Sequence, residues 1–202
     1  KPMVISTFIM VATYSLFYIM TAFAQAYSRT PATLSEAGYP MGLGIPANTF
    51  TGLLLMSAIV FAIFISISGL YADKIGRRKW LIWTTVSILI FALCMPLFLG
   101  NGTPASVFAF LVIGMALMGM TFGPMAALLP ELFPTEVRYS GASLAYNIAS
   151  IIGATIAAMI SLKINALYGL MGVGIYLAIN AFLTLLALLA SKETKNVDLT
   201  QI

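Results

Sequence analysis

Long stretches without a single charged residue are the feature that most limits what this chain can fold into. Asp, Glu, Lys and Arg are absent from residues 2–28, 37–72, 80–130, 139–162 and 164–191. A helix needs about 20 apolar residues to cross a bilayer, so each stretch holds at least one span. The longest holds two, because a Gly/Asn/Pro turn at 100–104 divides it. The stretches predict six transmembrane helices.

Composition supports a membrane protein and excludes a soluble domain. Hydrophobic residues make up 61% of the 202 residues and charged residues 8%, and the mean hydropathy is +1.02. A soluble domain carries about 25% charged residues. A transmembrane β-barrel would show alternating segments of about ten residues, and these stretches are longer and continuously apolar. The predicted fold class is an all-α membrane protein.

The predicted helices and the positions of the cations together set an orientation. We expect helices at about 3–27, 49–72, 80–99, 105–129, 139–162 and 171–190. Eight cations then fall on one side, namely Lys1, Lys74, Arg77, Arg78, Lys79, Arg138, Lys192 and Lys195. Only Arg29 and Lys163 fall on the other side. The positive-inside rule therefore places both termini in the cytoplasm.

Several classes of function are excluded by missing residue types. The chain has no His, which removes His-based acid–base catalysis and His metal ligands. Ser143 in a Gly-Ala-Ser sequence lacks a base, and no phosphate-binding GxxxxGK[ST] loop is present. The few loop cations indicate membrane orientation rather than nucleic-acid binding. We expect no enzyme activity, no metal and no cofactor, and Cys94 to be a packing residue.

Polar side chains repeat at helical spacing on three of the predicted helices. The stripes are Tyr14, Tyr18, Thr21 and Gln25; Ser143, Tyr146, Asn147 and Ser150; and Tyr176, Asn180 and Thr184. Polar groups facing lipid tails are costly, so the stripes should face protein or water. They serve either interhelical hydrogen bonds or substrate contact, and the first explanation is favoured most for the third stripe.

Small residues form a second pattern, which predicts close helix packing without chemistry. Gly119 and Gly123 form a GxxxG pair. On the fifth predicted helix Gly141, Ala145, Ala149, Gly153 and Ala157 recur every four residues. Such spacing lets two helix backbones approach closely.

Two loop motifs resemble those of the major facilitator superfamily. Residues 69–79, GLYADKIGRRK, match its G-x-x-x-D-x-x-G-R-R-K loop. Residues 130–141, PELFPTEVRYSG, resemble the E-x-F-P-x-x-x-R-x-x-G segment of sugar porters, and their continuation is most similar to the metabolite:proton symporter branch. A third resemblance is Glu193-Thr194-Lys195 after the last helix, which is similar to the tail motif of sugar porters. That motif begins with Pro, and this chain has Lys192 in its place.

The resemblance implies that this chain is the C-terminal six-helix bundle of a twelve-helix inner-membrane transporter, built from two inverted three-helix repeats. Its partner would be an N-terminal half absent from this sequence, and the Lys-Pro beginning, without Met, also suggests a fragment. The function implied is proton-coupled symport of an organic acid or zwitterion. A sugar or drug porter of the superfamily is the alternative, and a six-helix channel or structural membrane protein is the alternative from another class.

The resemblance also suggests site residues. The first, second, fourth and fifth helices should line the central face, and the substrate should contact Tyr14, Tyr18, Tyr146 and Asn147, with Gln25 nearer the outer end. The helix interiors hold no Asp, Glu, His, Lys or Arg, so the proton site is expected in the missing half.

The cytoplasmic gating motif would consist of Gly69, Asp73, Gly76, Arg77, Arg78, Glu131 and Arg138. Asp73 and Glu131 lie at helix C-termini, where an anion is unfavourable. Glu131 is therefore expected to pair with Arg77, Arg78 or Arg138, and Asp73 to face the other bundle. The alternative is a simple positive-inside anchor whose ion pairs contribute almost nothing.

Overall fold

Helices account for nearly all of the regular structure in the part of the chain that the computed structural model describes. That part is residues 2–191, with all side chains except those of residues 154, 155 and 158. The elements are α1 (Pro2–Tyr18), the π-helical η1 (Ile19–Phe23), α2 (Ala24–Arg29), α3 (Ala47–Ile75), α4 (Arg77–Leu93), α5 (Met95–Leu99), α6 (Pro104–Glu131), the 3₁₀-helical η2 (Thr135–Val137), α7 (Arg138–Ser150), the π-helical η3 (Ile151–Thr155) and α8 (Ile156–Ala190). The expected tail motif at 193–195, and the cations Lys1, Lys192 and Lys195, lie outside the described residues.

Four helical stretches are long and apolar enough to cross a membrane. They are Pro2–Arg29, Ala47–Ile75, Pro104–Glu131 and Met159–Ala190. The first joins α1, η1 and α2 end to end, and the last contains a break at Gly169, where φ is +68°. The prediction of an α-helical membrane protein is thereby supported. Around Gly169, α8 divides into a first arm (156–168) and a second arm (170–190).

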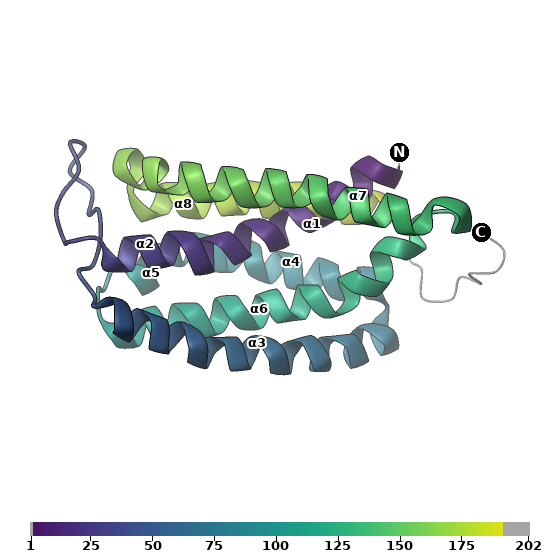
Figure 1. Ribbon diagram of the computed structural model, residues 1–202, viewed down its shortest axis with the longest axis horizontal. Helices are drawn as coiled ribbons and strands as arrows, with labels where there is room; N and C mark the ends of the chain where they lie inside the picture. Colours follow the sequence, from purple (N-terminus) through teal and green to yellow (C-terminus); the bar gives the residue numbers. More distant parts are fainter. Residues whose placement is uncertain (1, 192–202) are drawn as a thin grey trace.

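The helices lie in two layers (Figure 1). The nearer layer holds α7 with the first arm of α8, then α1, α6 and α3, and behind it lie α4 and the second arm of α8. The main packing partners agree, since α3 lies against α6, α1 against α7 and α8, and α4 against α8 and α6. The third and sixth predicted helices are therefore the ones set behind the other four.

Two of the predicted loops are shorter than the sequence suggested. Between α3 and α4 only Gly76 departs from helical geometry, with φ +113° and ψ 129°, a conformation that L side chains rarely adopt. The fifth predicted helix continues past Leu162 to Gly169, because no Gly or Pro interrupts residues 163–168. Charged residues predict longer loops here than the structure has, because charge marks a loop in a soluble protein but also suits the end of a membrane helix.

Close packing around small residues holds neighbouring helices together. In lipid there is little hydrophobic force between helices, so the fit of their surfaces matters. A Cβ at Gly119 would lie 2.7 Å from the carbonyl oxygen of Phe61, so α6 and α3 meet at backbone distance. Ser68 Oγ adds a 3.0 Å hydrogen bond to the Gly119 carbonyl. The packing role predicted for the Gly119/Gly123 pair is confirmed.

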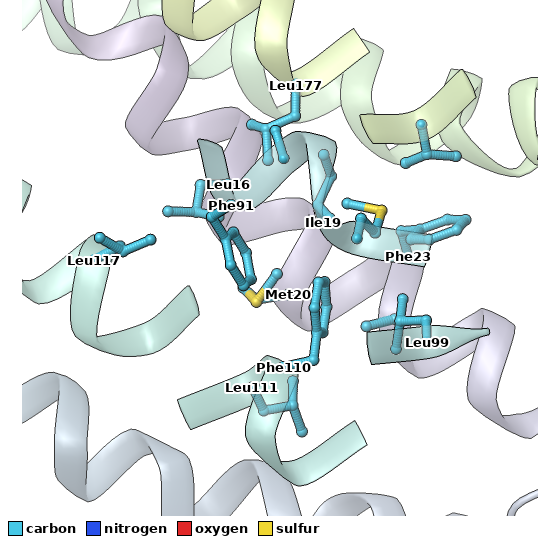
Figure 2. Close-up of a cluster of buried hydrophobic side chains, with 14 of the residues drawn as sticks. Leu16, Ile19, Met20, Phe23, Phe91, Leu99, Phe110, Leu111, Leu117 and Leu177 are labelled. Carbon is cyan, nitrogen blue, oxygen red and sulfur yellow. The ribbon is translucent and has the colours of Figure 1, made fainter. Parts of the chain in front are cut away.

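The main core lies between the two layers. Figure 2 shows side chains from the first helical stretch meeting those of α4, α6 and α8, among them Leu16, Met20, Phe23, Phe91, Phe110 and Leu177. Phe91 and Phe110 stack with ring centroids 5.1 Å apart. Gly114 leaves the space that Met20 fills. This core fixes the roll of the first helix, and with it the direction in which its polar stripe points.

Candidate functional site

The first helix presents one half-exposed stripe, and that stripe is the polar one that the sequence predicts. Tyr14, Tyr18, Thr21 and Gln25 are all half-buried in this chain, whereas most of their neighbours are fully buried. The Thr21 hydroxyl donates to the carbonyl of Phe17 at 2.8 Å, so it places no further demand on the core. The side chains of Tyr14, Tyr18 and Gln25 lie on a face that the rest of this chain leaves partly open.

The second predicted pair is divided between two environments. Tyr146 of α7 packs against the same buried cluster as Tyr14 of α1. Asn147 is exposed, and its amide donates to the carbonyl of Ser143, one turn earlier, at 2.8 Å. The structure therefore brings Tyr14 and Tyr146 together and leaves Asn147 on the open surface of α7.

π-Helical turns follow both groups of candidate residues. η1 begins directly after Tyr18, and η3 begins directly after Ser150, three residues beyond Asn147. Where η3 meets α1, a Cβ on Gly153 would lie 2.7 Å from the Cβ of Tyr14 and 3.0 Å from the Val11 carbonyl oxygen. π-Turns inside α-helices often mark functional sites. Sequence reasoning identified the polar stripes but gave no sign of these turns.

Two of the three residues of the third stripe, Asn180 and Thr184, serve packing, as the favoured interpretation predicted. The Asn180 amide donates to Ser15 Oγ at 3.0 Å, and the Thr184 hydroxyl donates to the Phe8 carbonyl at 2.6 Å. Both residues are buried against α1. A cavity of about 490 Å³ lies between Tyr39 and both arms of α8, and Tyr176, the third residue of the stripe, helps to line it. Its lining is mostly apolar and includes none of the four predicted contact residues.

A charge cluster lies where α3 and α4 meet the end of α6. Arg77 Nη1 donates to Glu131 Oε1, and Arg77 Nε donates to Asp73 Oδ1 at 3.2 Å. Of the three partners considered for Glu131, the structure thus selects Arg77. Burial lowers the pKa of Arg77. Hydrogen bonds and charge attraction, first from Glu131 and then from Asp73, together raise it by more than burial lowers it, so the net shift of the pKa is upward. The guanidinium remains a permanent cation.

The other arginines of the predicted gating motif have different partners. Arg78 donates from Nε to the Leu188 carbonyl at 2.7 Å and from Nη2 to the Leu189 carbonyl at 2.8 Å, so it caps the end of α8. Arg138 donates from Nη2 to Thr135 Oγ1 at 3.3 Å. Gly69 lies in α3 with open space where a Cβ would be. The motif therefore joins the ends of α3, α4, α6 and α8.

One contact at this end was missed by sequence reasoning, although the sequence contains its signal. Trp80 Nε1 donates to the Met120 carbonyl of α6 at 2.9 Å. Pro124 lies four residues later and has no N–H to offer that carbonyl, so the helix leaves it free. The carbonyl four residues before any mid-helix proline could have been marked as an acceptor in need of a donor.

Comparisons with known proteins show the family to which the chain belongs. The family model described as "Sugar (and other) transporter" matches residues 41–202. A "Putative metabolite transport protein" of Haemophilus influenzae is 86% identical over 202 residues, which are 100% of this chain and 46% of that protein. The "Inner membrane metabolite transport protein YhjE" of Escherichia coli is 52% identical over 198 residues, 97% of this chain and 43% of that protein. The chain belongs to this transporter family of the major facilitator superfamily.

A more distant relative has a substrate in its name. The "Proline/betaine transporter" of Salmonella typhimurium is 32% identical over 149 residues, 72% of this chain and 29% of that protein. No solved structure matches the chain. The relatives named here are transport proteins rather than enzymes, and this chain spans less than half the length of each.

Proposed function

We propose that this chain is the C-terminal bundle of a secondary transporter that carries a small metabolite across the bacterial inner membrane by alternating access. The observation that carries the proposal is the polar stripe of the first helix, which lies on a face left open by the rest of the chain. Polar groups on a lipid-facing surface are costly, so a second bundle and an aqueous path should cover them. This chain covers 46% of the relative to which it is 86% identical, and one half of such a transporter would cover about that share.

The membrane topology we propose has six spans with both termini in the cytoplasm. Besides α3 and α6, the spans are the first helical stretch, α4 with α5, α7 with the first arm of α8, and the second arm of α8. The bend between α4 and α5 follows from Pro96, which cannot donate to the Ala92 carbonyl. Two inverted repeats of three spans each would complete the arrangement.

Tyr14, Tyr18, Tyr146 and Asn147 are proposed to contact the substrate. The half-exposure of the three tyrosines and the open position of Asn147 support this role. Tyr18→Phe and Asn147→Ala in the full-length protein should each raise the KM for transport. The matched control is Tyr176→Phe in the second arm of α8, which lies in the layer behind the one that holds α1 and α7. Unchanged KM values in both site variants would remove these residues from the site.

The gating motif is proposed to hold the cytoplasmic side closed in one state and to release it in the other. Asp73 is 64% exposed in this chain, which leaves room for a contact with the N-terminal half. Neutralising Asp73 or Glu131 should slow turnover at normal expression. It should also change the accessibility of cysteines placed on the two sides of the membrane. Wild-type transport in both variants would leave only a positive-inside anchor.

Uptake by the full-length protein tests the function directly. Right-side-out membrane vesicles should accumulate a labelled substrate from a panel of short carboxylates and betaines with saturable kinetics. The names of the proline/betaine relatives support the zwitterions in this panel. A protonophore should abolish accumulation if protons drive it. Uptake that is linear in concentration and insensitive to the protonophore would favour a channel instead.

A further inference from the structure

The half-exposed stripe of the first helix ends on a cation. Arg29 is the last residue of α2, is exposed, and lies one turn beyond Gln25. The Gln25 amide satisfies both of its polar groups when its nitrogen donates to the Thr21 carbonyl at 3.2 Å and its oxygen accepts from Arg29 Nη1 at 2.9 Å. The guanidinium is therefore tied to the stripe rather than free to point in any direction.

The backbone that carries Arg29 is held firmly in place. Residues 43–45, at the far end of the loop that follows α2, donate three backbone hydrogen bonds to residues at the end of this helix. These run from Leu43 to the Tyr27 carbonyl at 3.1 Å, from Ile45 to Ser28 at 2.7 Å and from Gly44 to Thr30 at 2.8 Å. The charge consequently has a fixed origin, which a recognition group needs if it is to orient a ligand.

No carboxylate neutralises this charge among residues 2–191. Both ion pairs found there belong to Arg77, at the opposite end of the bundle. The other cation on the outer side, Lys163, lies in the first arm of α8 and not on the stripe. An arginine offers a planar fork of donors that fits a carboxylate. Beside low-dielectric walls, such a charge also attracts anions from a distance.

We propose that Arg29, oriented by Gln25, recruits the carboxylate of the transported substrate at the outer mouth of the tyrosine stripe. This role rests on the proposed transport function and specifies that the substrate carries a carboxylate. Arg29 admits the anionic group, and the tyrosines further along the stripe receive the remainder of the molecule. Two other roles are available to Arg29: the helix dipole stabilises a cation at the C-terminus of a helix, and an arginine can bind a lipid phosphate. Neither role would attract anions to the stripe.

Charged thiol reagents test the proposal without knowledge of the substrate. In a cysteine-free full-length protein, Thr21→Cys or, in a second reporter, Ala22→Cys is treated with a negatively charged sulfonatoethyl methanethiosulfonate and its positively charged trimethylammonium counterpart. The ratio of the two rates should favour the anion. Arg29→Gln should lower that ratio by about tenfold, Arg29→Lys should retain most of it, and Gln25→Leu should lower it partly.

Lys163→Gln is the matched control, because it removes the other outer cation and should leave the ratio unchanged. An unchanged ratio in Arg29→Gln overturns the proposal and assigns Arg29 to the helix dipole or to lipid. An equal fall in Lys163→Gln also overturns it, since the effect would then be a general surface potential. If neither reagent reacts at either reporter, the stripe is closed to water and the proposal is wrong.

A transport measurement separates this proposal from the function on which it rests. With labelled glycine betaine as the probe, Arg29→Gln vesicles should show a KM raised about tenfold with kcat largely kept. Absence of uptake of every carboxylate and betaine in the panel by the wild-type protein would count against the proposed function, while the reagent ratio would still decide the role of Arg29. Wild-type uptake with an unchanged KM in Arg29→Gln would overturn the recruitment role alone.

Discussion

Arg77 joins the carboxylates of two helices that are far apart in sequence. It donates to Glu131, 54 residues away at the end of α6, and to Asp73, one turn earlier at the end of α3. The two carboxylates differ sharply in exposure, with the Glu131 side chain 11% exposed and the Asp73 side chain 64% exposed. The pair with Glu131 should therefore contribute most of the stability of this cluster, because solvent screens the pair with Asp73.

Glu131→Gln is expected to destabilise the protein more than Asp73→Asn. Losing the Glu131 charge leaves the mostly buried Arg77 with only an exposed partner, which should lower the free energy of unfolding by about 1–3 kcal/mol. Asp73→Asn should change it by less than about 0.5 kcal/mol. Thermal unfolding of the full-length protein in detergent measures both. Equal losses in the two variants would contradict the argument from burial.

Gly153→Ala is expected to separate η3 from α1. The added Cβ would lie 2.7 Å from the Tyr14 Cβ and 3.0 Å from the Val11 carbonyl oxygen, so a helix must shift. Overpacking of this kind should destabilise the protein by about 1–3 kcal/mol. It should also displace Tyr14, and transport should weaken with it. The measurements are the melting temperature and KM of the full-length protein.

Gly52→Ala is the matched control, because a Cβ at Gly52 in α3 would meet nothing within 4 Å. The greater helix propensity of alanine should make this change neutral or slightly stabilising. If Gly153→Ala and Gly52→Ala behaved alike, the close contact between η3 and α1 would not constrain the fold.

The parts of this architecture that could be predicted from sequence are those set by local rules. Charge-free stretches predict the helices, and the Gly119/Gly123 spacing predicts a close helix contact, whose partner the structure identifies as α3. Which arginine Glu131 would choose could not be read from the sequence, because three lay within reach of the same loops. The partner of Glu131 depends on the direction that α4 takes after Gly76, and tertiary packing sets that direction.

The candidate site shows the same division. Helical spacing placed Tyr14 and Tyr18 on one stripe, since both precede η1 and the period of 3.6 residues holds up to Tyr18. The π-helical turns could not be predicted in this way, because they break that period at a site chosen by packing. Gly153 is the one local hint, and its spacing from the other small residues predicts helix packing alone.

Ser15 and Asn180 should show a measurable energetic coupling. Their 3.0 Å hydrogen bond is buried and joins the first helix to the second arm of α8. Interhelical hydrogen bonds in membranes contribute about 0.6 kcal/mol on average and up to about 1.7 kcal/mol. A double-mutant cycle of Ser15→Ala and Asn180→Ala, measured by unfolding of the full-length protein, should give a coupling in that range. Zero coupling would show that the polar stripe of this arm has another purpose.

A second double-mutant cycle concerns Trp80 and Pro124. These two residues should be energetically coupled without direct contact, through the Met120 carbonyl. Pro124 cannot donate to the Met120 carbonyl, and the Trp80 indole donates to it instead at 2.9 Å. Trp80→Phe keeps a ring that can stack on Tyr71, whose centroid lies 5.8 Å away, but it removes the donor. The unpaired carbonyl should then cost about 1–3 kcal/mol of stability.

Replacing Pro124 by Ala supplies a backbone N–H that can close the helical bond to Met120. In that background the carbonyl no longer needs the indole, so Trp80→Phe should become nearly neutral. The two substitutions together should therefore be less destabilising than Trp80→Phe alone by about 1 kcal/mol or more. Unfolding of the four full-length variants in detergent measures this difference. Strictly additive effects would mean that water or another group already satisfies the Met120 carbonyl and that Trp80 is held in place by its ring alone.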